Sequence, residues 1–188
     1  MILLLCGLSG AGKSTLANHV KNKLQHFEIP VEVIDADEYR QQLFKDLSYT
    51  REDRNENVRR LGYIANKFSS HHIVTLVSAI NPYDEIRKEL VDKYRNVKVV
   101  HVDCNINVLI KRDTKGLYKK ALLPEGHPDK ISNLTGINDP FEVPECPDLY
   151  INTSQLNIRQ SVDEVYTFVV QNIIKERYAI NPFVNVAV

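Results

Sequence analysis

The stretch Gly7-Leu8-Ser9-Gly10-Ala11-Gly12-Lys13-Ser14 decides how this chain folds. It fits the pattern G-x-x-x-x-G-K-[ST], in which glycines let the backbone wrap so tightly that successive N–H groups face phosphate oxygens. An apolar run, Ile2–Cys6, precedes the loop, and a helical pattern, Lys13–Gln25, follows it. A strand, a glycine loop and a helix in this order are the context that a P-loop requires. A glycine turn without a ligand is therefore the weaker interpretation.

The residue types in this loop indicate its chemistry. Lys13 supplies a mobile cation for the β and γ phosphates of a nucleoside triphosphate, and Ser14 offers a hydroxyl to Mg²⁺. The helix that starts at the same place adds the positive end of its dipole. The loop therefore predicts binding of ATP with Mg²⁺ by Gly7, Leu8, Ser9, Gly10, Ala11, Gly12, Lys13 and Ser14.

Short apolar runs alternate with helical patterns along the rest of the chain. Further strands are expected at Val31–Asp35, Ile73–Ser78, Val97–Val102 and Leu149–Ile151. Continuous β-branched runs suit strands that are covered on both faces. Strands that alternate with helices predict an α/β fold: a P-loop-type, mainly parallel sheet with helices on both faces.

Capping patterns place three of the intervening helices. Thr50-Arg51-Glu52-Asp53 has the capping-box pattern, Asn81-Pro82 predicts the start of a helix that runs to about Lys93, and Ser161-Val162-Asp163-Glu164 predicts the start of the last helix. Residues 112–147 do not continue the alternation of strands and helices, because they are rich in proline and polar residues. So long an irregular stretch in a compact domain is usually a functional lid or a binding loop.

Size, charge and cysteine spacing limit the functional class. The 188 residues suggest one domain over residues 1–180, followed by a peripheral tail at 181–188. Lys+Arg and Asp+Glu are equal at 24 each, which gives no support for a general nucleic-acid binder. The first apolar run is too short to span a membrane, so no membrane partner is expected. Cys6, Cys104 and Cys146 match no disulfide framework, and a cytoplasmic, reducing compartment fits best.

Two carboxylates follow the second predicted strand in Asp35-Ala36-Asp37. Ligands of open parallel sheets bind beyond the carboxyl ends of the strands. A carboxylate pair at that place can hold Mg²⁺ through water or orient an attacking hydroxyl. Asp35 is equally suited to cap a helix, and Asp37 could combine a capping role with a metal role.

Basic and polar side chains follow on the next segments. Arg40 lies five residues past the second strand, and Arg54 and Asn57 share a helix face. An arginine fork beside an anionic substrate is physically sensible. From periodicity alone, a solvated face paired with neighbouring acids is favoured for Arg54 and Asn57.

The irregular stretch opens with a basic run, Arg112 to Lys120. Such a run can close over phosphates and exclude water, although an ordinary charged surface loop is the plainer interpretation. Phe141, further along the stretch, could stack on a base or anchor the loop in the core.

Taken together, these motifs resemble those of the adenylyl-sulfate kinase family, in order and over nearly the whole chain. GLSGAGKST at Gly7–Thr15 is similar to that family's phosphate loop, and DADEYR at Asp35–Arg40 to its D-G-D-x-x-R segment. LSYTREDRNENVRR at Leu47–Arg60, RDTKGLYKKA at Arg112–Ala121 and LTGINDPFEVPECPD at Leu134–Asp148 resemble three further family motifs. The last two motifs are uncommon among other P-loop kinases.

The resemblance implies roles for individual residues. Lys13, Asp35 and Asp37 would be catalytic, and Ser14 and Asp37 would hold Mg²⁺. Thr15 and Arg112 would join the ATP-binding loop, and Tyr49 and Phe141 would enclose the substrate base. The implied substrate-binding set is Asp37, Arg40, Tyr49, Arg54, Asn57, Ile80, Asn81, Lys115, Lys119, Leu134 and Phe141. The resemblance also suggests a homodimer, which no sequence pattern here demonstrates.

Three positions depart from the family pattern. Asn81 stands where the family has a serine that can carry phosphate, so a phosphoserine at this position is impossible. Leu134 replaces the usual phenylalanine of the lid, and Ala36 replaces a glycine. Direct transfer between two bound nucleotides needs no covalent intermediate, so the changes do not exclude kinase activity, and the first two bear on the identity of the acceptor.

The sequence therefore predicts a kinase that transfers the γ-phosphate of ATP to the 3′-hydroxyl of adenylyl sulfate. A second hypothesis keeps the chemistry and changes the acceptor to another nucleotide-linked group, such as cytidine diphosphoramidate. A third makes the chain a nucleotide-binding module without catalysis, against which Lys13, Ser14 and Asp37 argue.

Overall fold

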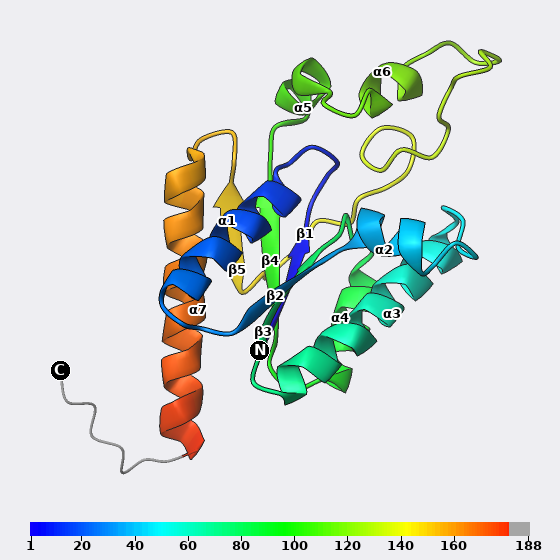
Figure 1. The fold of residues 1–188 in the computed structure, drawn as a ribbon. Helices are drawn as coiled ribbons and strands as arrows, with labels where there is room; N and C mark the ends of the chain where they lie inside the picture. Colours follow the sequence, from blue (N-terminus) through cyan, green and yellow to red (C-terminus); the bar gives the residue numbers. More distant parts are fainter. Residues whose placement is uncertain (181–188) are drawn as a thin grey trace.

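A five-stranded parallel sheet forms the centre of the protein (Figure 1). The computed structural model describes residues 1–180, with side chains to Glu176, so the tail predicted at 181–188 lies outside the described residues. The strand order is β2-β3-β1-β4-β5, and every neighbouring pair is parallel. This confirms the α/β fold predicted from the sequence. The strands are β1 (Ile2–Cys6), β2 (Val31–Asp35), β3 (Val74–Ser78), β4 (Val97–Asp103) and β5 (Leu149–Asn152).

Helices cover both faces of the sheet because alternate side chains of each strand point to opposite sides. Helices α1 (Lys13–His26) and α7 (Ile158–Ile180) pack with Leu3 and Leu5 of β1 on one face. Helices α3 (Arg51–Ser70) and α4 (Asp84–Lys93) pack with Ile2 and Leu4 on the other. Three short helices lie near the carboxyl edge of the sheet: α2 (Ala36–Gln42), α5 (Ile106–Arg112) and α6 (Leu117–Ala121).

Two helix starts differ from their predictions. The helix expected from Asn81-Pro82 begins at Asp84, because Asn81 has a left-handed φ of 47° and Tyr83 is extended. The last helix begins at Ile158 rather than near Ser161. The cause is a reciprocal cap, in which Asn157 N donates to Gln160 Oε1 and Gln160 N donates to Asn157 Oδ1, both at 3.0 Å. The box at Thr50 is confirmed, since its hydroxyl accepts from Asp53 N.

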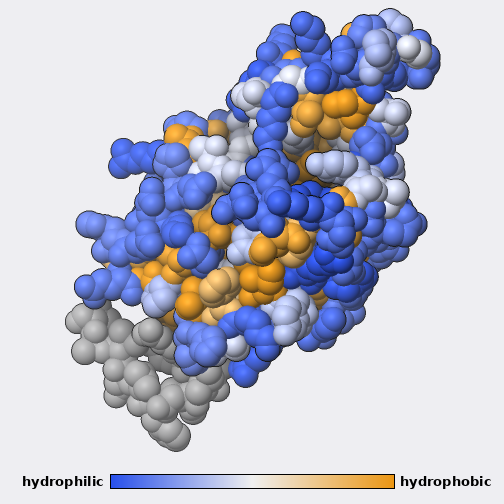
Figure 2. Space-filling view, turned by 45° about the vertical axis from the view of Figure 1, so that its right-hand side comes forward, coloured by the Kyte–Doolittle hydropathy of each residue, from blue (hydrophilic) through white to orange (hydrophobic). Residues whose placement is uncertain are grey.

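The stretch 112–147 is less irregular than its composition suggests. It contains α6, and Tyr118, Ala121 and Leu134 are buried in the same cluster as α1 and α7. The segment beyond α6 projects from the body of the molecule (Figure 1), and apolar surface shows in the upper part of the space-filling view (Figure 2). Leu122, directly after α6, is one of the exposed large hydrophobic residues. The stretch therefore has a base packed on the core and an outlying tip.

Two predictions from composition can be compared with the structure. Cys6 and Cys104 are buried, whereas Cys146 is exposed, and all three are free, in agreement with spacings that match no disulfide framework. Burial raises the pKa of the Cys6 thiol to about 11. Within residues 1–180, no helix is both long enough and apolar enough to cross a membrane.

Candidate active site

The ends of β1, β2 and β3 converge on the helix that follows the glycine loop. The Ser14 hydroxyl donates to Asp35 Oδ2 at 2.5 Å and shares a hydrogen bond with Ser78 Oγ at 3.0 Å. Asp35 and Ser78 are register partners at the carboxyl ends of β2 and β3, which explains why both reach Ser14. The sequence did not single out Ser78; the signal available was its place at the end of a predicted strand.

The glycine loop is wound against the neighbouring strand. Gly7 has a φ of 149°, and a Cβ at this position would lie 2.1 Å from the carbonyl oxygen of Val102, so no side chain fits. Gly7 N donates to Ile80 O at 3.1 Å, which ties the loop to the segment after β3. The loop therefore has a fixed entry, as a cradle for phosphate requires.

Lys13 lies folded back on its own loop. Its Nζ donates to the carbonyl oxygens of Gly7 and Leu8, both at 2.8 Å, and only 8% of the residue is exposed. Burial, together with the nearby charge of Lys115, lowers the pKa of Lys13 to about 8. An anionic phosphate at this place would compensate the buried ammonium better than two neutral carbonyl groups do.

Two hydroxyl groups hold the loop from outside. Tyr118 of α6 donates to Ser9 O at 2.8 Å, and Thr153 Oγ1, just past β5, lies 3.0 Å from Ala11 O and 3.1 Å from Asp103 O. Sequence reasoning assigned no role to Tyr118 or Thr153. The only sequence signal for Thr153 was its position after the fifth predicted strand. The only signal for Tyr118 was that it is the aromatic residue within the basic run.

Asp35 caps a helix, as one of its two interpretations predicted, and also contacts the glycine loop. Its Oδ1 accepts from Asp37 N at 2.9 Å and so caps α2, while its Oδ2 accepts from Ser14. The Asp37 carboxylate points away from the helix and forms an ion pair with Lys115 of the lid. The structure thus brings Ser14, Asp35 and Asp37, predicted for catalysis or the metal, close to Lys115, predicted for the substrate.

Arg40 and Arg54 frame Tyr49. The guanidinium carbons lie 4.8 Å and 5.5 Å from the Tyr49 ring centroid, respectively. Arg40 also donates to Ser48 O at 2.8 Å. The Tyr49 side chain is 56% exposed, so one side of this aromatic ring remains open to a ligand.

The helix face of Arg54 and Asn57 is buried, which corrects the solvated face that periodicity favoured. Arg54 is 8% exposed and donates to Tyr49 O, Thr135 Oγ1 and Asn133 O at 3.0, 3.1 and 2.6 Å. The loop around residue 135 covers this face, and no helical pattern could have shown that. Asn57 is 4% exposed, and its Oδ1 has no hydrogen-bond partner among the residues that the structure describes.

Asn81 lies on the segment between β3 and α4. It is 3% exposed, its carbonyl oxygen accepts from Arg87 Nη1 at 2.7 Å, and its Oδ1 is unpartnered. Arg87 also donates to Glu142 O at 2.5 Å, so this segment is joined to the loop that carries Phe141. Buried unpaired acceptors such as Asn57 Oδ1 and Asn81 Oδ1 are groups that a ligand N–H or O–H could satisfy.

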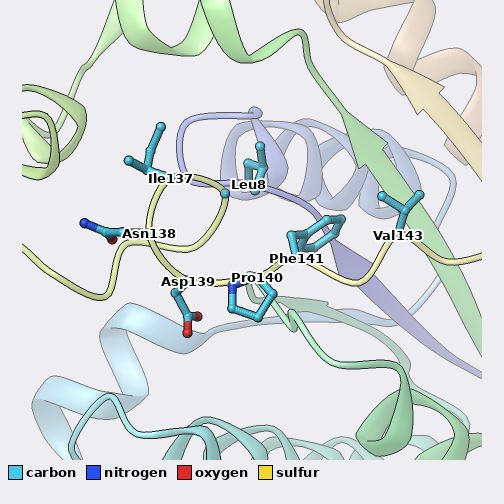
Figure 3. Close-up of a pocket in the computed structure, with 8 residues that line it drawn as sticks. Leu8, Ile137, Asn138, Asp139, Pro140, Phe141 and Val143 are labelled. Carbon is cyan, nitrogen blue, oxygen red and sulfur yellow. The ribbon is translucent and has the colours of Figure 1, made fainter.

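Phe141 lines an open hollow of about 610 Å³ (Figure 3). Leu8 of the glycine loop forms its opposite part, while the Phe141 ring stacks on His101 with centroids 5.8 Å apart. Phe141 is thus both a loop anchor and a wall of the hollow. Tyr49 is not among the lining residues, which are Leu8, Gly136, Ile137, Asn138, Asp139, Pro140, Phe141 and Val143.

The other predicted residues lie on the lid, except Thr15, which is in the first turn of α1. Arg112, Lys115 and Ser9 line a small cleft beside the glycine loop, and Arg112 Nη1 lies 3.9 Å from Cys104 Sγ. Lys119 is exposed on α6. Leu134 is only 6% exposed and packs in the core cluster, away from solvent.

A family model described as adenylylsulphate kinase matches residues 1–152. The chain belongs to the adenylyl-sulfate kinase family. The match covers the glycine loop, the Asp35–Asp37 segment and the whole of the lid, which are the parts that carry the site.

Curated relatives support the same assignment. The adenylyl-sulfate kinase of Synechococcus sp. (strain JA-3-3Ab) is 44% identical over 159 residues, which cover 85% of this chain and 88% of the relative. The adenylyl-sulfate kinase of Chloroflexus aurantiacus is 42% identical over 165 residues, covering 88% and 86%. Both relatives are named as kinases of the same substrate, so the chain is a member of an enzyme family with one established kind of chemistry.

A solved structure shows the same fold. The APS kinase of Mycobacterium tuberculosis, determined in complex with AMPPNP and APS, superposes with a TM-score of 0.82 at 34% identity. The alignment covers 89% of this chain and 96% of that one. That enzyme therefore holds an ATP analogue and APS on the architecture described here for the adenylyl-sulfate kinase family.

Proposed function

We propose that this protein transfers the γ-phosphate of ATP to the 3′-hydroxyl of adenylyl sulfate, giving 3′-phosphoadenylyl sulfate. The proposal rests on one observation in a chain of this family. Lys13, the Ser14–Asp35 pair and the Asp37–Lys115 pair lie together at one edge of the sheet. Such an edge is where open parallel sheets bind nucleotides.

The chain's own residues divide the work of phosphoryl transfer. The amides of Gly7 to Ser14 receive the phosphates of ATP, and Lys13 exchanges two carbonyl partners for phosphate oxygens. Asp37, whose side chain is 62% exposed, orients the acceptor hydroxyl and receives its proton. Catalysis of this kind is mostly positioning and electrostatic stabilisation.

The residues present fit Mg²⁺ as the metal of the site. A hydroxyl and two carboxylates are oxygen donors of the kind that Mg²⁺ prefers, and Ser14 is already oriented by Asp35. Ser14 and Asp37 would hold the ion, with Asp35 behind Ser14. When bound, Mg²⁺ supplies positive charge that offsets the charge on the β and γ phosphates.

The acceptor side has polar groups suited to a nucleotide. Arg40 and Arg54 would face the phosphosulfate, with the exposed Tyr49 ring and the wall at Phe141 available to the base. Asn81 supplies a buried carbonyl oxygen where the family has a serine. Because Asn81 cannot carry phosphate, the transfer is direct from ATP to the acceptor.

One observation keeps a second acceptor in view. The unpartnered Oδ1 of Asn81 can accept from an N–H group, and cytidine diphosphoramidate carries one at its terminal phosphorus, where adenylyl sulfate has a sulfate without N–H. The two acceptors differ in base and in terminal group. A comparison of kcat/KM for adenylyl sulfate and cytidine diphosphoramidate under identical conditions therefore separates them.

The decisive experiment follows ADP release with Mg·ATP and adenylyl sulfate. We expect ADP only when the acceptor is present, together with 3′-phosphoadenylyl sulfate in equal amount, and no release by Lys13→Ala. Acceptor-dependent ADP with cytidine diphosphoramidate alone would replace the proposal by the second candidate. Tight ATP binding with no ADP from any acceptor would leave a nucleotide-binding module instead.

Oligomeric state and compartment belong to the proposal in the same way. We infer a homodimer in the cytoplasm, which the family resemblance and the free cysteines favour. Light scattering on a size-exclusion column gives the mass directly, and a monomer of 21.6 kDa would contradict the dimer.

A further inference from the structure

Tyr118 joins the lid to the glycine loop. This residue of α6 is 2% exposed and packs in the same cluster as Ala11 of the loop and Leu109 of α5. Its hydroxyl donates to Ser9 O at 2.8 Å. Burial raises the pKa of Tyr118 to about 12, so the hydroxyl keeps its proton throughout the pH range in which kinases are assayed.

The turn that precedes α6 has a single well-defined shape. The Asp113 carboxylate accepts from Tyr118 N at 3.0 Å and from Lys119 N at 2.8 Å, which caps the first turn of α6. Gly116 N donates to Asp113 O at 2.9 Å, and Asp113 and Gly116 have left-handed φ angles of 27° and 65°. Lys115 therefore extends from a rigid turn.

Lys115 reaches across the mouth of the glycine loop. Its ammonium forms an ion pair with Asp37, at the start of α2. Its charge also contributes, after burial, to the lowered pKa of Lys13. Lys115 thus contacts the carboxylate proposed to orient the acceptor and is near enough to the lysine of the loop to influence its pKa.

We propose that Tyr118 is a positioning residue that holds Lys115 in place over the phosphates by anchoring α6 to Ser9. The inference rests on the proposed phosphoryl transfer. The proposal divides the lid into two parts. Its anchored base, residues 112–121, belongs to the donor site, whereas the projecting segment beyond α6 does not. Binding of a triphosphate to the loop then stabilises α6 through the Tyr118–Ser9 hydrogen bond.

The test begins with Tyr118→Phe, which removes one oxygen atom and keeps the ring in the core. We expect kcat to fall roughly tenfold, because small errors in placing a charged group are costly in transfer reactions. The dissociation constant of Mg·AMPPNP should change less than about threefold, since the loop amides and Lys13 remain. Tyr63→Phe makes the same chemical change on an exposed ring of α3 and should leave both quantities unchanged.

A double-mutant cycle with Lys115→Met distinguishes positioning from general support of the fold. If Tyr118 acts through Lys115, Tyr118→Phe lowers kcat by less than about twofold in the Lys115→Met background. Independent, multiplied effects of the two substitutions, or wild-type kcat in Tyr118→Phe, would overturn the proposal. A thermal unfolding midpoint close to wild type checks that the variants are folded.

Hydrogen exchange gives a readout that does not depend on the acceptor. Mg·AMPPNP should slow exchange of the amides of residues 117–121 in the wild type and in Tyr63→Phe, and much less in Tyr118→Phe. Equal slowing in wild type and Tyr118→Phe, or none in either, would refute the link between loop and lid. Because no adenylyl sulfate is present, a wrong acceptor assignment leaves this result untouched.

Discussion

The Ser14 hydroxyl lies 2.5 Å from Asp35 Oδ2, and this hydrogen bond joins the glycine loop to the end of β2. The other oxygen of the same carboxylate caps α2 through Asp37 N. One side chain therefore orients the hydroxyl proposed to hold Mg²⁺ and fixes the start of the helix that carries Asp37. Structural and catalytic roles at Asp35 cannot be separated by looking at activity alone.

We therefore predict different outcomes for the two aspartates. Asp35→Ala should lower the free energy of unfolding by about 1–2 kcal/mol, because α2 loses its N-cap, and should also impair turnover. Asp37→Ala should leave stability within about 0.5 kcal/mol, because that side chain is exposed, and reduce kcat by about a hundredfold or more. Urea unfolding and ADP release measure the two quantities. Equal stability of both variants would contradict the capping role.

Burial of Lys13 predicts a pH dependence of stability. Its pKa is lowered to about 8 in the folded protein, against 10.5 ordinarily, so between these values the unfolded chain binds more protons. Stability therefore rises as pH increases from about 8 toward 10.5, to the extent that Lys13 contributes. The raised pKa of the buried Cys6 thiol acts in the opposite direction in both proteins. Chemical denaturation across this range should therefore show the stability of wild type rising relative to that of Lys13→Met.

The lowered pKa of Lys13 also predicts that the affinity for ATP falls as pH rises above about 8. A neutral Lys13 must gain a proton before it can pair with phosphate, so binding takes up a proton in this range. Calorimetry of Mg·AMPPNP binding in buffers of different ionisation enthalpy measures the uptake. Zero uptake at pH 8.5 would show that Lys13 is charged in the free protein.

Gly136 predicts a steric effect on the glycine loop. It has a φ of 88°, and a Cβ there would lie 2.6 Å from Leu8 Cδ2. Gly126 has a similar φ of 83° and open space around it, so Gly126→Ala carries only the backbone cost of about 1–2 kcal/mol. Gly136→Ala should carry that cost and also weaken Mg·AMPPNP binding by displacing Leu8. Leu8→Ala should restore affinity in the double variant; no restoration would rule out the contact as the cause.

The burial of Arg54 predicts that even a conservative substitution at this position lowers stability. Lysine cannot satisfy three acceptors arranged for a guanidinium, so Arg54→Lys should lower the free energy of unfolding by about 1–3 kcal/mol and weaken acceptor binding. Arg60→Lys on the same helix alters a partly exposed pair with Asp46 and Glu56 and should leave stability close to that of wild type. Denaturation curves of the two variants give the comparison.

Much of this architecture could be read from the sequence. The strands were predictable because parallel strands covered on both faces are continuous apolar runs, and the glycine loop because its pattern and its flanking elements agree. The start of α7 was missed because Asn157 and Gln160 cap it as Asn-x-x-Gln, a less obvious relative of the serine box at 161. The start of α4 was misplaced because Asn81 takes a left-handed conformation that its residue type permits and does not require.

Site residues near the strand ends could be predicted from the sequence. Those whose surroundings depend on distant loops could not. Ser14, Asp35 and Asp37 follow from the position of β1 and β2. The burial of Arg54 and Asn57 depends on a loop some eighty positions later, as the 81-residue separation of Arg54 and Thr135 shows. Periodicity reports only the faces of one helix, so it could not reveal this cover.

The hydrogen bond between Thr153 and Ala11 joins positions 142 residues apart. A growing polypeptide that has left the ribosome only as far as the lid has the complete sequence of its phosphate cradle, yet lacks both β5 and this support. Contacts of such long range form late, since much chain must be organised before its ends meet. A nascent chain therefore gains its full affinity for a nucleotide only after β5 has been made, and a bound triphosphate in turn stabilises those chains that have completed the sheet.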